Sequence, residues 1–149
     1  MMKIILLLIM VFTLGCHSIQ QPNTLYLTVP EMSERSYSTA TVAPSGARLV
    51  FISGLNAYGK KPVPKDVKAQ LEMVFSQLNE ALDIAGSKPE CILMIKQYST
   101  DFSDDFFEAF LDQKNKFLKG AKPSSALIPM AKIPGSDIDV EIELVAYQC

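Results

Sequence analysis

Residues 66–86 read DVKAQLEMVFSQLNEALDIAG and carry the clearest structural pattern in the sequence. Their apolar residues recur at intervals of three and four, which places one stripe on one side of an α-helix: Val67, Leu71, Val74, Phe75, Leu78, Leu82 and Ala85. Asp66 suits the N-terminal end of such a helix, where the helix dipole favours a negative charge. Gly86 is a typical C-terminal stop. The pattern predicts a helix over residues 66–85 with one face buried.

Two apolar segments flank this helix. Residues 48–53 (RLVFIS) contain four consecutive apolar residues at 49–52, and residues 91–95 (CILMI) are entirely apolar. Runs of this kind predict strands covered on both faces. A second helix is predicted from the N-cap Ser103 to Gly120, with an apolar side formed by Phe107, Phe110, Leu111 and Leu118.

The C-terminal part predicts a β-hairpin. Residues 126–132 (ALIPMAK) form its first arm, residues 134–137 the turn and residues 140–147 the second arm. Pro129 has no amide hydrogen to donate, so the first arm is either an edge strand or bulged at that point. In the second arm one face is apolar: Val140, Ile142, Leu144 and Ala146.

Shorter strands are predicted over residues 25–29 and 36–43, which makes five or six strands and two helices in an α+β domain. Two helices cover only one face of such a sheet. The strands at 49–52 and 91–95 nevertheless require cover on both faces. We therefore expect a second copy of the same sheet to cover the other face, which makes the protein a homo-oligomer.

The N-terminus resembles an export signal. Lys3 precedes an unbroken apolar run at residues 4–12, which is much shorter than the roughly 20 residues that span a bilayer. We expect residues 1–15 to be a signal peptide. Leu14-Gly15-Cys16 resembles a bacterial lipobox, in which Cys16 becomes lipidated, although Thr13 departs from the usual aliphatic residue. The alternative is an ordinary signal peptide in which Cys16 is incidental.

The predicted organisation after this signal is simple. Residues 16–24 form a polar tether, which includes His17, and residues 25–149 form one domain. An exported domain experiences oxidising conditions, so Cys91 and Cys149 could form a disulfide. A buried free thiol and a free terminal cysteine are the alternative.

Composition excludes several classes of function. The formal charge of the 149 residues is −2, and it becomes more negative if Lys3 is removed, which argues against nucleic-acid binding. The single histidine lies in the predicted tether, so neither a Ser-His-Asp triad nor a histidine metal site is expected in the domain. Three cysteines lack paired metal-ligand spacing. We expect no metal and no cofactor.

Five segments resemble one family. They are residues 37–44 (YSTATVAP), 50–54 (VFISG), 123–126 (PSSA), 131–134 (AKIP) and 140–146 (VEIELVA). Together they resemble the Rid family of reactive intermediate deaminases, also called RidA, YjgF or L-PSP-like proteins. The resemblance implies a chorismate-mutase-like fold and a trimer that packs through its sheets, with the small-molecule cleft between subunits.

The resemblance also implies a site, with one departure. In deaminating members, the arginine of a Pro-Ala-Arg-Ser motif binds the carboxylate of a 2-imino acid, and here Ser125 occupies that position. The glutamate that positions the attacking water corresponds to Glu141. Tyr37, Ser53 and Gly54 match other residues of the cleft. A hydroxyl carries no charge and cannot replace the paired donors of a guanidinium.

Other cations could in principle replace the arginine. Arg35 lies close to Tyr37 in the sequence, and Lys122 precedes the motif. Ser124 and Ser125 have no histidine in the domain to activate them as nucleophiles.

We therefore expect an exported, membrane-anchored or periplasmic protein with weak or altered imine or enamine hydrolase (deaminase) chemistry. Its expected partners are a small metabolite and its own copies, with the membrane contacted only through a lipid anchor and no nucleic acid. The alternative is a non-catalytic ligand-binding or structural lipoprotein with a vestigial cleft. The ribonuclease activity also associated with the family is the weakest option, because the domain lacks a basic stripe.

Overall fold

The computed structural model describes residues 23–59, 62–135 and 137–149. Within them it has two α-helices, α1 (Val67–Ile84) and α2 (Asp104–Leu118). Its strands, in chain order, are β1 (Leu25–Leu27), β2 (Ala40–Val42), β3 (Leu49–Asn56), β4 (Ile92–Ser99), β5 (Ser124–Pro129) and β6 (Val140–Tyr147). The predicted signal peptide (residues 1–15), Cys16 and His17 lie outside the described residues. Among the helices that are described, none is long and apolar enough to cross a membrane.

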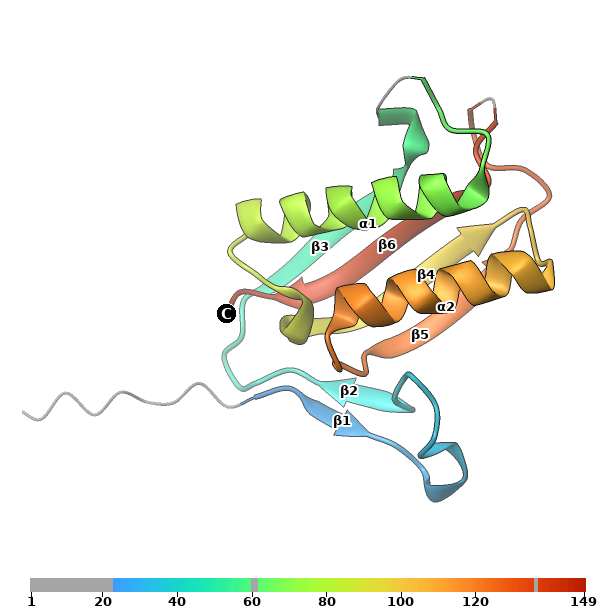
Figure 1. Ribbon diagram of the computed structural model, residues 1–149. Helices are drawn as coiled ribbons and strands as arrows, with labels where there is room; N and C mark the ends of the chain where they lie inside the picture. The colour runs from blue at the N-terminus through green and yellow to red at the C-terminus, as the bar shows by residue number, and fades with distance from the viewer. Residues whose placement is uncertain (1–22, 60–61, 136) are drawn as a thin grey trace, which may run out of the picture.

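The strands form two sheets (Figure 1). The larger has four strands in the order β3-β6-β4-β5, and the smaller pairs β1 with β2 in antiparallel fashion. In the larger sheet β6 runs antiparallel to both of its neighbours, whereas β4 and β5 are parallel. The α+β class and the two helices are confirmed, and the six strands are divided between two sheets. The strand predicted over residues 36–43 is shorter than expected, because only β2 pairs.

The predicted C-terminal hairpin is wrong. β5 does not pair with β6; it pairs in parallel with β4, with Ser125 opposite Ile95, and β6 lies between β3 and β4. Parallel strands need a long crossover, and α2 provides it between β4 and β5. Pro129 ends an edge strand, where its missing amide hydrogen removes no hydrogen bond from the sheet interior.

Both predicted helices are confirmed, and so is the N-cap at Ser103. The predicted apolar side of α2 is wrong in one member, because Phe107 is 46% exposed and its neighbour Phe106 is buried instead. The side chain of Asp66 accepts a hydrogen bond from the Ala69 amide at 3.0 Å, and that of Ser103 accepts one from the Phe106 amide at 3.2 Å. Such caps satisfy amide groups that the first turn leaves without partners. Gly86 follows Ala85, the C-cap residue of α1, and has a φ of 67°, in the left-handed region that glycine adopts readily.

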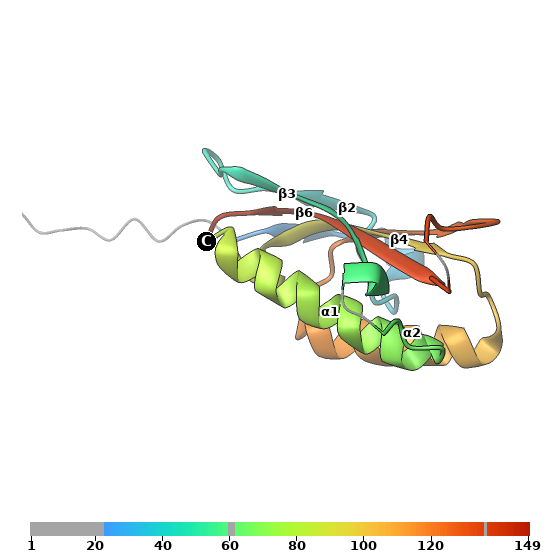
Figure 2. The ribbon, with the colours of Figure 1, turned by 90° about the horizontal axis from the view of Figure 1, so that it is seen from above.

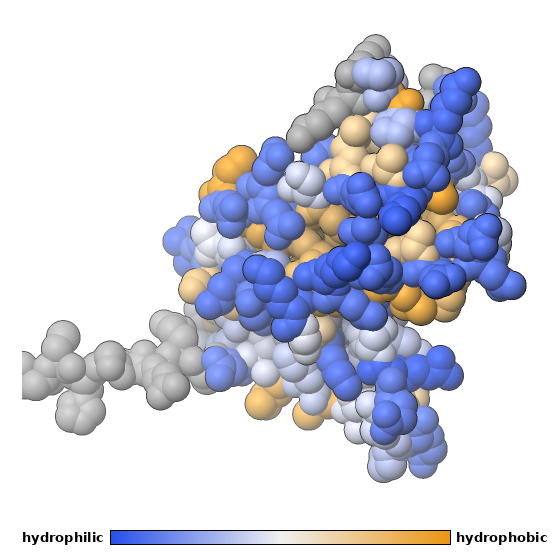
Figure 3. All heavy atoms as spheres, viewed as in Figure 1, coloured by the Kyte–Doolittle hydropathy of each residue, from blue (hydrophilic) through white to orange (hydrophobic). Residues whose placement is uncertain are grey.

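Both helices lie on the same face of the large sheet, as the edge-on view shows (Figure 2). The main core fills the space between the helices and the sheet, and its fully buried members include Leu71, Leu78, Leu82, Ile92, Ile95, Phe106 and Ile142. The outward side of this helix layer is mostly hydrophilic (Figure 3). The helices and the large sheet thus form two layers with the core between them.

The other face of the large sheet is covered only in part. Near Leu93 the β1–β2 sheet and the following turn cover it, because Leu93 packs with Cys91 and Tyr147 against Ala43 and Ala47. On β3, by contrast, Phe51 is 74% exposed. The expectation that both apolar strands need a second copy therefore applies to β3 alone. We call the uncovered surface around β3 and β6 the open face.

The structure pairs Cys91 with Cys149 in a disulfide, with their Cα atoms 6.6 Å apart. Cys91 lies in a short 3-10 helix (Pro89–Cys91) immediately before β4. The bond therefore joins the end of the chain to the start of a central strand. The backbone amide of Cys149 also donates to the Gly86 carbonyl at 3.1 Å. Of the two alternatives that the sequence left open, the structure has the disulfide.

Candidate functional site

Tyr37 and Ser125 line one cavity of about 440 Å³. It lies between α2, the edge strand β5 and the loop before β2. α2 contributes mostly apolar side chains to the wall, including Phe107, Phe110 and Leu111. We call this cavity the α2 pocket. The resemblance placed Tyr37 and Ser125 in the ligand site, and the structure brings these two residues together.

Ser125 faces the helix layer. Its β4 partner, Ile95, is completely buried in the core, and residues paired across a sheet share a face. The Gln97 amide nitrogen donates to the Ser125 hydroxyl at 3.3 Å. Gln97 is itself buried, so a neutral hydrogen-bonding pair stands where the family resemblance places an arginine.

The two cations proposed from the sequence as substitutes differ in position. Arg35 lines the α2 pocket and is exposed. Lys122 does not line it, and its ammonium donates to the Ser33 carbonyl at 3.4 Å. Ser124 points away from the pocket, with its hydroxyl donating to the Leu93 carbonyl at 3.0 Å.

Sequence reasoning missed Lys114, which also lines the α2 pocket. This residue is only 3% exposed, and its ammonium lies 5.4 Å from the centre of the Phe110 ring. Burial lowers the pKa of Lys114, because the charged form loses hydration. Helical spacing could have revealed it. Lys114 is four residues after Phe110 and three before Phe117, so it falls within the buried stripe of α2.

Glu141, Ser53 and Gly54 form a second group, on β6 and β3. The Glu141 carboxylate accepts a hydrogen bond from the Asn56 amide at 2.7 Å. The pairing of β3 with β6 is interrupted between Ile52 and Leu55, and this irregularity contains Ser53 and Gly54. A side chain at Gly54 would collide with the Glu141 carboxylate. The glycine is therefore what allows β3 to approach this carboxylate so closely.

A charged network adjoins Glu141. The Lys96 ammonium contacts the Glu143 carboxylate at 2.6 Å, and this hydrogen bond lowers the pKa of Glu143. Tyr98 lies beside them, and burial together with a hydrogen bond to Glu143 raises the pKa of its hydroxyl. Glu143 is therefore neutralised by Lys96. Glu141 has instead the neutral Asn56 amide as its hydrogen-bond partner.

The two groups lie on opposite faces of the sheet. The neighbours of Glu141 on its strand, Val140 and Ile142, are fully buried beneath the helices, so Glu141 points to the open face. Ser125 points toward α2. One chain therefore does not unite Ser125 and Tyr37 with Glu141 and Gly54.

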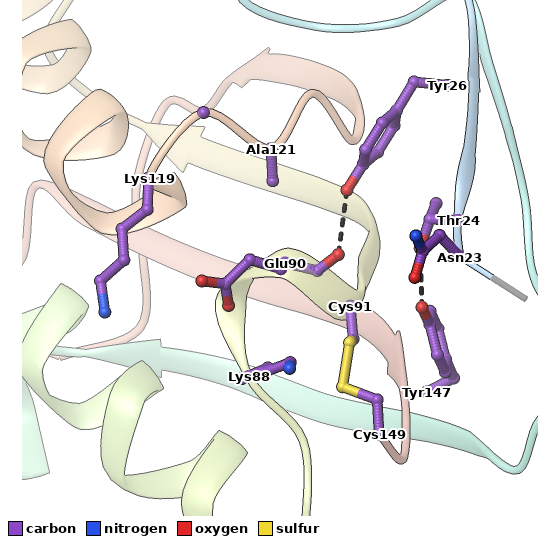
Figure 4. A pocket seen from close by; sticks show the side chains of 11 residues that line it. Asn23, Thr24, Tyr26, Lys88, Glu90, Cys91, Lys119, Ala121, Tyr147 and Cys149 are labelled. Atoms are coloured by element: carbon purple, nitrogen blue, oxygen red, sulfur yellow. Dashed lines mark hydrogen bonds between the residues drawn. A yellow bond between two sulfur atoms is a disulfide. The ribbon is translucent and has the colours of Figure 1, made fainter. Parts of the chain in front are cut away.

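A second cavity, of about 570 Å³, adjoins the disulfide (Figure 4). The Tyr26 hydroxyl donates to the Glu90 carbonyl at 3.1 Å, and Thr24 donates to the Tyr147 hydroxyl at 3.0 Å. Lys88 and Lys119, both exposed, also line this cavity. It contains none of the site residues that the sequence indicated. In the described parts of the chain, no three His, Cys, Asp or Glu side chains are grouped so that they could bind a metal ion.

Comparison with known proteins identifies the family. Residues 30–148 match the family model described as endoribonuclease L-PSP. The chain belongs to this family, which is also called the Rid or YjgF family. No curated protein matches the sequence significantly.

Solved structures of Rid-family proteins resemble this one. YyfB from Yersinia pestis, a Rid-family protein of unknown function, is 23% identical with a TM-score of 0.75, over 85% of this chain and 99% of that one. Yeast Mmf1 is 25% identical with a TM-score of 0.62, over 86% of this chain and 98% of that one. A YjgF-family protein from Neisseria meningitidis is 21% identical with a TM-score of 0.60, over 87% and 98% of the two chains. These likenesses establish the Rid fold.

Proposed function

We propose that the protein is an envelope member of the Rid family that forms a homotrimer and binds a small metabolite in clefts between its subunits. In each cleft the α2 pocket of one subunit meets the Glu141 and Gly54 group of its neighbour. The expected chemistry is weak or altered hydrolysis of imines or enamines.

The single observation that carries this proposal is the division of the site residues between two sheet faces. The residues that the family resemblance assigns to one cleft lie apart within a chain, and a neighbouring chain is the simplest way to unite them. The open face supports such packing, because Leu49 and Phe51 of β3 are exposed large apolar residues on it. Exposed apolar patches of this kind mark interaction surfaces.

The reaction follows from the chemistry of Glu141. In imine hydrolysis, water adds to the carbon of the C=N bond, a proton passes to nitrogen, and ammonia then leaves as the carbonyl forms. A carboxylate that is not neutralised by a lysine can orient the water and accept its proton. The neutral Ser125 weakens orientation of the substrate, which lowers the rate as well as the affinity.

Export and anchoring remain proposals with two supports. The N-terminal pattern resembles a lipoprotein signal, and the Cys91–Cys149 disulfide is typical of proteins in oxidising compartments. If Cys16 is lipidated, Cys16→Ala abolishes fatty-acid labelling, and globomycin causes the precursor to accumulate. A soluble protein with an unmodified N-terminus would contradict the anchor.

Hydrolysis of 2-iminobutanoate by the purified full-length chain tests the catalytic proposal. We expect a slow but measurable release of ammonia that Glu141→Ala abolishes. Glu143→Gln is the matched control, because it changes a carboxylate on the same strand and face whose partner is already Lys96. Binding of 2-oxobutanoate without any hydrolysis would instead support the non-catalytic alternative.

A further inference from the structure

We propose that Lys114 binds the carboxylate of the ligand and thereby takes the place of the arginine that is absent at Ser125. This inference rests on the proposed function of the cleft and specifies its ligand as a small anion. In this chain the positive charge is carried by α2 rather than by the edge strand β5, where the family motif has its arginine. Because Lys114 lies outside the motif, comparison with the motif alone does not reveal this difference.

The burial of Lys114 is the first support. A lysine is almost never so fully buried without a partner. Among the residues that the structure describes, its ammonium has the Phe110 ring as a neighbour but no carboxylate within ion-pair distance. A ring compensates only partly for lost hydration. An anionic ligand would supply the missing countercharge.

The surroundings of Lys114 are the second support. The charged groups that share its pocket are Glu34 and Arg35, both exposed and opposite in sign, on the loop before β2. The remaining wall is neutral, formed on β4 and β5 by Gln97, Ser125 and Leu127 and on α2 by Phe107, Phe110, Leu111 and Asn115. Tyr37 adds a phenol. Lys114 is therefore the charge held within the pocket, and an apolar wall strengthens its attraction for an anion.

The exchange of residue type has a chemical consequence. A guanidinium holds a carboxylate through two parallel N–H donors, whereas an ammonium is a compact point charge on a flexible stem. Lys114 can retain affinity for an anion while fixing its orientation less firmly. We therefore expect a cleft that favours carboxylates yet performs the family's hydrolysis slowly.

A matched pair of ligands tests the inference on the full-length protein in detergent. The probes are 2-oxobutanoate and 2-oxobutanamide, which differ in charge and little in size, and their dissociation constants are measured by titration calorimetry. We expect wild type to prefer the carboxylate by about tenfold or more, the usual worth of a charge-assisted hydrogen bond.

Three variants assign this preference to one side chain. Lys114→Met keeps the length and the apolar stem, so it is expected to fold, and it should bind both probes equally. Lys114→Arg keeps a cation and should retain the preference. Lys116→Met is the matched control on the same helix, since Lys116 is exposed and pairs with Asp112; it should leave both constants unchanged.

The pH dependence provides an independent readout. Because burial lowers the pKa of Lys114, the free pocket loses its charge at a lower pH than an exposed lysine would. Affinity for 2-oxobutanoate should therefore weaken as pH rises through that lowered pKa. Affinity for 2-oxobutanamide should stay level, and Lys114→Arg should abolish the alkaline decline.

Two results would overturn the inference and leave the cleft itself intact. They are equal binding of both probes by wild type, and a carboxylate preference that survives in a folded Lys114→Met protein. Binding of neither probe by wild type would overturn the inference and the proposed function together.

Discussion

The two halves of the candidate site differ in how much of their surroundings one chain supplies. The α2 pocket is walled by a helix, a strand and a loop of the same chain, and it holds a buried cation. The Glu141 group lies on the open face, where Phe51, farther along β3, is 74% exposed. The α2 pocket is thus enclosed largely by its own chain, whereas the surface around Glu141 is left uncovered by it. If the proposed function holds, we expect ligand recognition to depend on the fold of one chain and the chemistry to depend on assembly.

The largest expected effect comes from breaking the open half. Phe51→Asp places a charge on the surface that we propose to lie between subunits, where burying it would cost several kcal/mol. We expect dissociation to monomers in sedimentation velocity and loss of hydrolysis.

Ile84→Asp is the control for this change. Ile84 is 90% exposed at the end of α1, in the helix layer rather than on the open face. The same introduction of charge there should leave assembly unchanged. Dissociation by both variants to the same extent would contradict the assignment of the interface to the open face.

A smaller effect is expected from strengthening the enclosed half. Ser125→Arg adds a guanidinium on β5, facing the α2 pocket, and should raise hydrolysis of 2-iminobutanoate by about tenfold, the worth of one charge-assisted contact. Lys114 will repel the new cation in part, so the gain should increase in the double variant with Lys114→Met. Initial rates of ammonia release measure both, and the gain should vanish when Glu141→Ala is added.

The smallest expected effect is on stability. Lys114→Met should raise the free energy of unfolding at neutral pH by about 1 kcal/mol, because functional sites commonly retain groups that destabilise the fold. The pKa of Lys114 is lowered in the folded state, so the unfolded chain binds more protons and wild-type stability should rise with pH above that lowered pKa. The difference between the variants should therefore shrink at alkaline pH. Urea unfolding at pH 7 and pH 10 measures it, and a less stable Met variant would contradict the cost of burial.

Much of the fold follows from local patterns in the sequence. The stripe of α1 and the caps at Asp66 and Ser103 gave both helices, since these signals act within a few residues. The pairing of β5 could not be obtained in this way. Two adjacent strands with a turn between them suggest a hairpin, and only the crossover through α2 places β5 beside β4 and leaves β6 in the centre.

The sequence named several residues of the candidate site but not how they are arranged. The family motifs named Tyr37, Ser125, Gly54 and Glu141 as residues of one cleft, and the structure places only the first two in the same pocket. Motifs carry no information about which sheet face each residue occupies. The spacing of Lys114 from Phe110 and Phe117 indicates that it lies on the buried side of α2, but it was missed because charged residues on helices are usually solvated. Its depth depends on how α2 packs over Phe110, which is a property of the tertiary structure.

The central claim is that the two halves meet between copies of the chain, and cross-linking tests it most directly. One population carries Ser53→Cys, beside Gly54 on the open face, and another carries Ser125→Cys in the α2 pocket. The two are co-expressed and treated with a short bismaleimide, and the cross-linked peptides are identified by mass spectrometry. We predict a covalent link between residue 53 of one chain and residue 125 of another. Efficient labelling of both cysteines by a monofunctional maleimide, with no such link between chains, would contradict the account.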